Sequence, residues 1–277
     1  MWLPEQANQW VMTKLLNVVV GKHPEALQPD HGLLEQNPSM NSGFLEKVRC
    51  GRITIQRTDV DRFTETGLVL ANGESLDVDV VICATGYDPF DAPYVPDDAM
   101  RSFETPPHTA DLYKLIIPPR YPNLFFLGFI ELFGPLPPAA EAQARYVAAL
   151  LSGQVKRPTE KQMLAHIRKT QRHQAKTYIR STRHSFTETY IPYVDDVLEP
   201  LGAVPTFRKM LVKMFSGNPI RGLQLLNAVW FGVSSSAQWR LYGHGAKAEL
   251  ARETVLRIAG GKATLAKKEI DLLSGKC

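Results

Sequence analysis

The sequence predicts an α/β fold, and three features of the chain support this prediction. An unbroken apolar run from Val80 to Ala84 has the pattern of a strand that is covered on both faces, as in a parallel sheet. Apolar and polar residues alternate over residues 52–76, which is typical of a small antiparallel sheet. The segments that follow residue 158 have helical spacing of their apolar residues. The expected architecture is therefore a sheet with an antiparallel β-meander and a helical C-terminal region.

Composition is that of an ordinary globular protein. The chain has 277 residues, of which 44% are hydrophobic and 22% charged, enough for one large domain or two small ones with a sizeable core. The net charge of +4 is spread thinly and gives no reason to expect nucleic acid or an anionic membrane surface as a partner. The three scattered cysteines form no Cys-x-x-Cys pair, so a reduced, cytoplasmic setting is expected. Neither a secretory leader nor a transmembrane segment is visible.

The N-terminal part is expected to be only partly regular. Residues 5–20 have helical spacing, whereas prolines and glycines in residues 27–51 rule out long elements. Residues 52–76 read as a meander because Asn72-Gly73 is a strong hairpin signal, since both residues accept positive φ. This meander leads into the predicted buried strand, residues 78–84.

The C-terminal part is expected to be mainly helical. Eight prolines predict that residues 88–122 are irregular and lie on the surface. A second buried strand is predicted at residues 124–127, ending at Gly128, followed by a helix at 139–152 with prolines before it and Gly153 after it. A long polar helix is expected at 158–183, and shorter ones at 192–200, 205–215, 221–231 and 246–258.

The ends of the two predicted strands are the candidate binding positions. Ala84, Thr85 and Gly86 follow the first strand, where small residues let a ligand approach the backbone. Gly128 follows the second strand, and the next helix has a positive N-terminal end that suits a phosphate or the anionic edge of a flavin. Gln143, on that helix, offers a further polar contact. An ordinary strand–helix unit explains the same spacing, so this alternative stays open.

Three other patterns carry weaker signals. Gly243-His244-Gly245 begins a Gly-x-Gly-x-x-Ala match, but no buried strand precedes it and no acidic residue ends a second strand, so a turn before a helix is favoured. The basic residues of 156–183 are best explained as a solvated helix face. His166 and His173 are too far apart in sequence for a metal site without further donors, so no metal is expected.

Short motifs spread along the chain occur in a recognisable order: Trp2-Leu3-Pro4, Pro29-Asp30-His31, Phe63-Thr64-Glu65-Thr66, Ala84-Thr85-Gly86-Tyr87, Tyr121-Pro122-Asn123-Leu124, Glu141-Ala142-Gln143, Tyr190-Ile191 and Arg240-Leu241-Tyr242-Gly243. Together they resemble the C-terminal half of a flavin-containing monooxygenase of the class that oxygenates amines and sulfides.

This resemblance implies two Rossmann-like domains, one for FAD and an inserted one for NADPH. Residues 1–86 would be the C-terminal part of the NADPH-binding domain, and residues 87–277 the returning part of the FAD-binding domain with a helical extension. Ala84, Thr85 and Gly86 would then lie at the domain crossover near the cofactor, and Gly128 and Gln143 would flank the flavin. The implied reaction uses NADPH and O2 to oxygenate a soft nitrogen or sulfur through a flavin C4a-hydroperoxide.

The sequence also departs from the family. The two glycine-rich dinucleotide loops and the Phe-x-Gly-x-x-x-His motif of its members do not occur in these residues. We therefore expect an incomplete two-domain flavoprotein, inactive by itself, with no catalytic residue to assign. A homodimer and peripheral association with the endoplasmic reticulum membrane are left open. Two alternatives remain: a Baeyer-Villiger or N-hydroxylating relative, and a non-catalytic module that binds a partner through exposed apolar surface.

Overall fold

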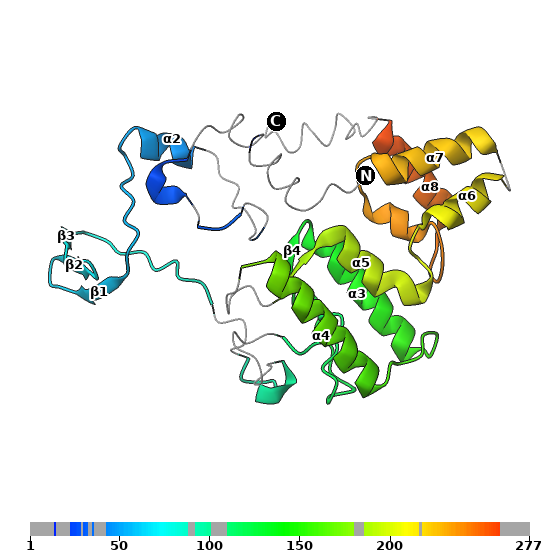
Figure 1. The fold of residues 1–277 in the computed structure, drawn as a ribbon, viewed down its shortest axis with the longest axis horizontal. Coiled ribbons are helices and arrows are strands. Elements are labelled where there is room, and N and C mark those ends of the chain that lie inside the picture. Colours follow the sequence, from blue (N-terminus) through cyan, green and yellow to red (C-terminus); the bar gives the residue numbers. More distant parts are fainter. Residues whose placement is uncertain are drawn as a thin grey trace, which may run out of the picture. The chain divides into compact units, whose positions relative to one another are not determined.

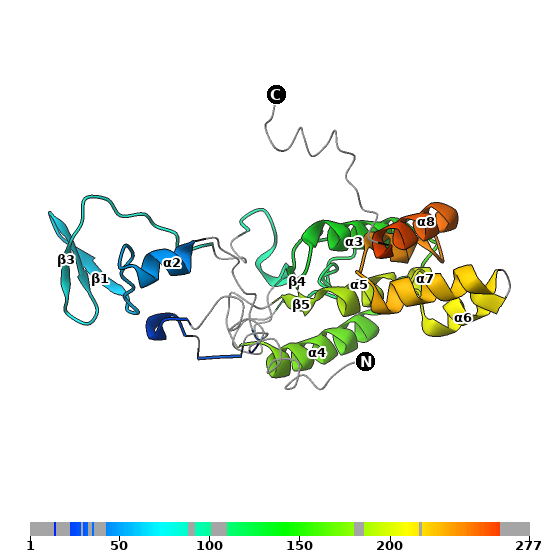
Figure 2. The same cartoon turned by 90° about the horizontal axis from the view of Figure 1, so that it is seen from above.

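The computed structural model describes residues 14, 23–28, 30–32, 35, 43–87, 92–100, 110–179, 186–215 and 218–260. The chain divides into two units, one of Met1–Thr109 with Gln171–Ser185 and one of Ala110–Thr170 with Phe186–Cys277. Figures 1 and 2 show the elements of each unit. Apart from Lys14, the helix predicted at residues 5–20 lies outside the described residues.

A three-stranded antiparallel meander forms in the first unit. Its strands are β1 (Val60–Phe63), β2 (Gly67–Leu70) and β3 (Ser75–Asp77), in the order β1-β2-β3 (Figure 1). Gly73 turns the chain between β2 and β3 with a φ of +87°, and the Asn72 side chain accepts a hydrogen bond from the Glu74 N–H at 3.0 Å. The predicted meander is confirmed, although its first strand begins at Val60 rather than near Arg52.

The remaining regular structure of the first unit is short. Apart from the end of a helix that begins in the second unit, the described residues of the first unit also form the 3-10 helices η1 (Glu25–Leu27) and η2 (Asp97–Ala99) and the α-helix α2 (Phe44–Arg49). Leu45 of α2 is buried. These short elements agree with the prediction that residues 27–51 hold no long element.

The strand predicted at residues 78–84 is wrong in this structure. No strand is present there, and the side chains of Val80 and Ile82 are 76% and 85% exposed. An apolar run of this kind becomes a buried strand only when neighbouring strands bind its edges and other elements cover its faces. None of the described strands pairs with it.

The strand predicted at residues 124–127 is also wrong. A single backbone hydrogen bond, from the Phe126 N–H to the Ile116 carbonyl oxygen at 2.9 Å, does not form a ladder, and Leu127 is 51% exposed. Strand pairing occurs instead between β4 (Glu131–Phe133) and β5 (Thr187–Thr189), which are parallel. Their separation in sequence explains why local patterns did not predict the pair. Among the described residues, parallel pairing is limited to these two strands.

The helices of the second half follow the predictions closely. They are α3 (Leu136–Leu151), α4 (Glu160–Thr177), α5 (Tyr190–Leu198), α6 (Phe207–Phe215), α7 (Pro219–Phe231) and α8 (Ala248–Ala259), with short 3-10 helices η4 (Glu199–Leu201) and η5 (Ser236–Arg240). The start of α7 shows why the local sequence suffices: the Asn218 side chain accepts hydrogen bonds from the N–H groups of Ile220 and Arg221, and Pro219 occupies the first turn. An α/β structure with an antiparallel sheet and helices is thus confirmed.

Burial in the second unit differs from the prediction at one segment. Residues 110–118 are irregular, as the prolines of residues 88–122 indicated, but they lie in the core rather than on the surface, and Ile116 and Ile117 have no exposed area. Proline predicts that a segment lacks regular backbone hydrogen bonds, but it does not predict exposure. The burial of this segment follows from apolar side chains such as those of Ile116 and Ile117. Lys114 and Leu115 have positive φ values of 53° and 55°, which turn the chain within the core.

Candidate functional site

Ala84, Thr85 and Gly86, predicted to lie beside a cofactor, are exposed in the first unit. Gly86 has a φ of +79°, and a side chain at this position would meet no atom within 4 Å. Gly86 therefore has the left-handed backbone conformation that favours glycine, and its backbone is open to approach. No described element covers the apolar residues that precede it.

Gly128 and Gln143 are brought together in the second unit. The Gly128 N–H donates a hydrogen bond to the Gln143 Oε1 at 2.7 Å, and Gly128 has a φ of +77°. The Gln143 Nε2 donates to the Tyr193 hydroxyl at 2.6 Å, which in turn donates to the Lys114 carbonyl oxygen at 2.8 Å. Gln143 has no exposed area, so its amide positions the loop at Gly128 and does not face solvent.

The N-terminal end of α3 is poor in hydrogen-bond donors. An α-helix leaves free the N–H groups of its N-cap and its first three residues. Here these positions are Pro135, Leu136, Pro137 and Pro138, so Leu136 alone carries an N–H group. The helix dipole remains, but the backbone donors that would hold a diphosphate are nearly absent.

A buried ionic cluster connects α4, α5 and the irregular core segment. The Lys114 Nζ lies 2.7 Å from the Asp196 Oδ2 and donates to the Asp196 main-chain oxygen at 2.6 Å. The His166 Nε2 lies 3.1 Å from the same Oδ2, and the His166 ring packs edge-on against Tyr113 with 4.9 Å between centroids. Sequence patterns did not indicate this cluster, because Lys114 lies in a segment predicted to be on the surface.

Burial and pairing act in opposite directions on the pKa values of this cluster. Burial lowers the pKa of the Lys114 ammonium, against the opposing effect of Asp196. Burial alone would raise the pKa of Asp196, but the hydrogen bond from His166 and the ion pair with Lys114 outweigh it, and the pKa lies below its usual value. Burial also raises the pKa of Tyr146, and its neighbour Tyr113 adds to this effect. Ionic contacts of Asp196 on α5 thus link this helix to Lys114 in the core segment and to His166 on α4.

The C-terminal motifs, separated by up to about a hundred residues, converge on α3. Glu141 forms an ion pair with Arg240, and Arg145 donates to the main-chain oxygens of Trp239 and His244, each at 3.2 Å. A side chain at Gly243 would lie 2.3 Å from the Leu201 main-chain oxygen, so this glycine allows close packing of two backbones. The Gly243-His244-Gly245 segment is thus the predicted turn before α8, and it contacts both α3 and the backbone near Leu201.

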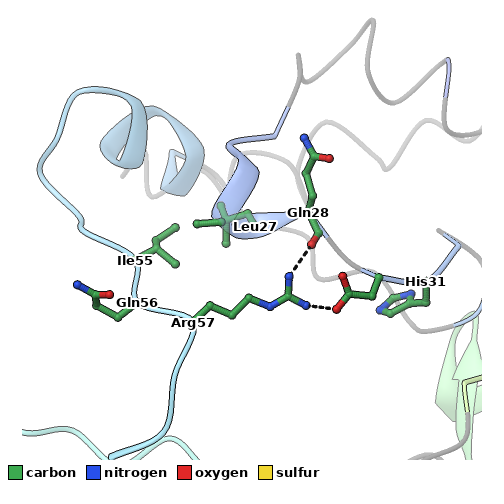
Figure 3. A pocket seen from close by; sticks show the side chains of 8 residues that line it. Leu27, Gln28, His31, Ile55, Gln56 and Arg57 are labelled. Carbon is green, nitrogen blue, oxygen red and sulfur yellow. Dashed lines mark hydrogen bonds and ion pairs between the residues drawn. The ribbon is translucent and has the colours of Figure 1, made fainter. Parts of the chain in front are cut away.

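A pocket of about 300 Å³ opens in the first unit (Figure 3). It is lined by Ala26, Leu27, Gln28, Asp30, His31, Ile55, Gln56 and Arg57. The Arg57 guanidinium lies 2.5 Å from the Asp30 carboxylate and donates to the Gln28 main-chain oxygen at 3.1 Å. Because its cation is already paired, this pocket gives no net charge with which to attract a phosphate.

Two further predictions concern the polar residues of α4 and metal binding. Basic residues along α4 occupy exposed positions, in agreement with a solvated helix face; they include Lys161, Arg168, Lys169, Arg172 and Lys176. Within the described ranges, no group of three or more His, Cys, Asp or Glu side chains is arranged to hold a metal ion. In the same ranges, no helix has both the length and the apolar character needed to cross a bilayer.

Comparison with known proteins identifies the family. The model of the flavin-binding monooxygenase-like family matches residues 1–266. The chain belongs to this family. Flavin-containing monooxygenase 5 of Rattus norvegicus is 32% identical over 88% of this chain and 44% of its own length. Dimethylaniline monooxygenase [N-oxide-forming] 2 of Rattus norvegicus is 30% identical over 92% of this chain and 45% of its own length.

This flavin-binding monooxygenase-like chain thus spans less than half the length of the curated relatives that it matches. A solved structure, the S-allyl-L-cysteine S-oxygenase from Allium sativum, is 22% identical and covers 71% of this chain and 42% of its own, with a TM-score of 0.41. The family membership rests on the sequence match along nearly the whole chain.

Replacing Gln143 by leucine is expected to lower the free energy of unfolding by about 1–3 kcal/mol, because the Gly128 N–H and the buried Tyr193 hydroxyl lose their partner. Urea unfolding followed by far-UV circular dichroism measures the change. Gln154→Leu, at an exposed glutamine just beyond α3, is the matched control and should stay within about 0.5 kcal/mol of the parent. Equal stability of the two variants would show that the amide does not support this loop.

Proposed function

We propose that this chain forms the C-terminal part of an FAD- and NADPH-dependent monooxygenase that oxygenates soft nitrogen or sulfur atoms of small molecules. The observation that carries the proposal is the family match over residues 1–266. A relative that spans 92% of the chain is named for N-oxide formation, which favours this activity over the Baeyer-Villiger alternative. The convergence of the Glu141, Tyr190 and Arg240 motifs in one unit is consistent with a folded portion of such an enzyme.

The residues that the structure describes do not fit the diphosphates of FAD or NADPH. The start of α3 has one N–H group where a phosphate site needs several, and Gly243, the first glycine of the Gly-x-Gly segment, packs against the backbone near Leu201. We propose that the glycine-rich loops are supplied by residues corresponding to the part of the relatives that this chain does not match. Alone, the chain would bind neither cofactor.

The proposed domain boundary follows from the same argument. Residues 1–86 would belong to the NADPH-binding domain and residues 87–277 to the FAD-binding domain, with Ala84, Thr85 and Gly86 at the crossover. The exposure of Val80 and Ile82 supports this proposal. An apolar segment of this composition forms a stable strand when other strands pair with its edges and other elements cover its faces. Gly128, held by Gln143, would then lie on the flavin side of the completed sheet. A cytoplasmic location remains part of the proposal.

The chain and a chimaera test this proposal together. In the chimaera, these 277 residues replace the matched portion of rat flavin-containing monooxygenase 5. After incubation with FAD and gel filtration, we expect visible flavin absorbance and NADPH oxidation with the chimaera, and neither with the chain by itself. The unmodified rat enzyme is the positive control.

Two results would contradict the proposal. Flavin retained by the isolated chain, with NADPH oxidation, would show that the described residues suffice for cofactor binding. A folded chimaera that retains no flavin would show that the chain does not complete such an enzyme, and would favour the non-catalytic module.

A further inference from the structure

The pocket of the first unit contains an ion pair whose two members keep unused hydrogen-bonding atoms. The Arg57 guanidinium contacts the Asp30 Oδ2 through its Nη2 at 2.5 Å and the Gln28 main-chain oxygen through its Nη1 at 3.1 Å. Other N–H donors of the guanidinium have no acceptor among the described residues. The Asp30 Oδ1 likewise accepts no hydrogen bond from the described residues. Both charged groups can therefore bind a ligand while they remain paired.

The ion pair gives this pocket two opposite charges side by side. The Arg57 and Asp30 side chains are 57% and 84% exposed, so the pair contributes little to stability and either group can turn towards a ligand at small cost. Among the described lining residues, these two carry the fixed charges, and the charges cancel. The pocket thus attracts neither anions nor cations by net charge, but it can bind a molecule that carries both signs.

His31 adds a hydrogen-bond acceptor to the pocket. Its Nδ1 lies 3.0 Å from the Gly32 main-chain oxygen. Because a carbonyl oxygen only accepts hydrogen bonds, the Nδ1 carries the hydrogen in this contact, and the Nε2 of the neutral ring is an acceptor. In the view of Figure 3, His31 lies on one side of the Arg57 guanidinium, and Leu27 and Ile55 lie on the other. The pocket therefore has a polar side and an apolar side.

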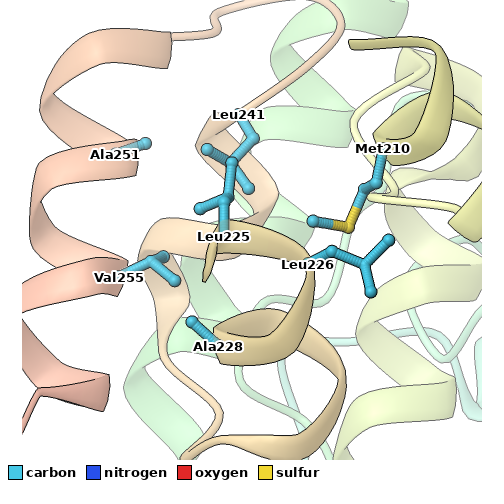
Figure 4. Packing of buried hydrophobic residues seen from close by; sticks show 7 residues of the cluster. All are labelled: Met210, Leu225, Leu226, Ala228, Leu241, Ala251 and Val255. Atoms are coloured by element: carbon cyan, nitrogen blue, oxygen red, sulfur yellow. The ribbon is translucent and has the colours of Figure 1, made fainter. Parts of the chain in front are cut away.

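Leu27 and Ile55 on the apolar side are only half-buried. In the second unit, by contrast, apolar side chains such as Leu225, Leu226 and Val255 fill the space between their helices and are almost fully covered (Figure 4). The apolar side chains of the pocket keep part of their area in water. A ligand with an apolar group would cover that area and gain from the hydrophobic effect.

We propose that this pocket binds a free α-amino acid with an apolar side chain. The ligand carboxylate would bind the Arg57 guanidinium, and the ligand ammonium would bind Asp30 and the His31 Nε2. The ligand side chain would cover Leu27 and Ile55. An α-amino acid fits because its ammonium and carboxylate are joined through a single carbon, as close together as the two charges of the pocket. The volume of about 300 Å³ lies at the lower end of the usual range for ligand pockets and suits a small molecule.

Isothermal titration calorimetry of the full chain tests this proposal. The probes are L-leucine, isocaproate, which lacks the ammonium, and isoamylamine, which lacks the carboxylate. We expect L-leucine to bind about tenfold more tightly than either, because each of the other two leaves one charge of the pocket without a partner. Inorganic phosphate should bind more weakly than L-leucine, since Asp30 repels it. The test needs neither flavin nor nicotinamide, so its result is independent of the proposed monooxygenase activity.

Two variants and a matched control identify the residues that bind the probe. Arg57→Gln is expected to weaken L-leucine binding about tenfold and Asp30→Asn about fivefold, because each removes one charged partner. Arg62→Gln is the control, since Arg62 forms an exposed ion pair with Asp61 on β1, outside the pocket. This variant should bind L-leucine like the parent, and circular dichroism should give the same spectrum for all variants.

Four results would overturn the proposal. The parent could show no saturable binding of L-leucine, or the same affinity for L-leucine, isocaproate and isoamylamine. Arg57→Gln and Arg62→Gln could weaken binding equally, which would show that the pocket is not the site. Tighter binding of inorganic phosphate than of L-leucine would show that Arg57 acts as a site for anions and that Asp30 does not select against them.

Discussion

Replacing Trp239 by alanine is expected to lower the free energy of unfolding of the second unit by about 3–5 kcal/mol. Trp239 is 2% exposed and packs edge-on against Tyr190 with 5.6 Å between centroids. Its Nε1–H donates to the Asp195 Oδ1 at 2.6 Å, so the substitution also leaves a partly buried carboxylate without this donor. Chemical denaturation followed by far-UV circular dichroism measures the loss.

Two variants separate packing from hydrogen bonding at this position. Trp239→Phe keeps an aromatic ring but not the donor and should cost less than the alanine variant. Trp230→Ala removes the same side chain at a position that is 48% exposed, and we expect it to cost about 1 kcal/mol or less. If the two alanine variants were equally stable, Trp239 would not be a core residue.

Replacing Asp196 by alanine is expected to lower the free energy of unfolding by about 2–4 kcal/mol. The Lys114 side chain is 3% exposed, so its ammonium would lose its ionic partner within the core. The effect is smaller than for a fully buried pair because the Asp196 side chain is 37% exposed and partly screened by water. Thermal and urea unfolding of the parent and the variant measure the difference.

The double variant Lys114→Met, Asp196→Ala is the control, because it removes both charges and should be more stable than Asp196→Ala alone. The pH dependence gives a second check. Since the pKa of Asp196 is lowered in the folded state, its stabilising effect is complete above its unfolded pKa of about 3.9 and is lost as the pH falls through the lower folded value. The difference between parent and variant should therefore shrink below about pH 4. A difference that is constant down to strongly acidic pH would exclude the ion pair as its cause.

Local sequence correctly predicted those elements that depend on contacts between residues a few positions apart. The start of α7 at Asn218-Pro219 and the hairpin at Asn72-Gly73 follow from side chains that satisfy nearby backbone groups. The predictions of strands at residues 78–84 and 124–127 were wrong, because a strand depends on partner strands elsewhere in the chain. An apolar run does not specify those partner strands.

In the candidate site, too, the sequence indicated single residues, whereas the contacts between distant residues were seen only in the structure. The sequence singled out Gly128 and Gln143, but the hydrogen bond between them appeared only in the structure, as did the contact of Gln143 with Tyr193. The ionic cluster around Lys114 had no sequence signal at all. A lysine in a proline-rich segment is normally exposed. Lys114 is buried here because its apolar neighbours Ile116 and Ile117 pack in the core.

By itself, the sequence determined the family through the order of its motifs along the chain. It also determined the helices of the C-terminal region and the meander, because capping residues and turn residues act over short distances. Tertiary structure alone decided which apolar residues are covered. Ile116 is enclosed by its unit whereas Ile82 and Leu223 are exposed, although all three have similar hydrophobicity. Burial depends on what packs against a residue, and that information is spread over the whole fold.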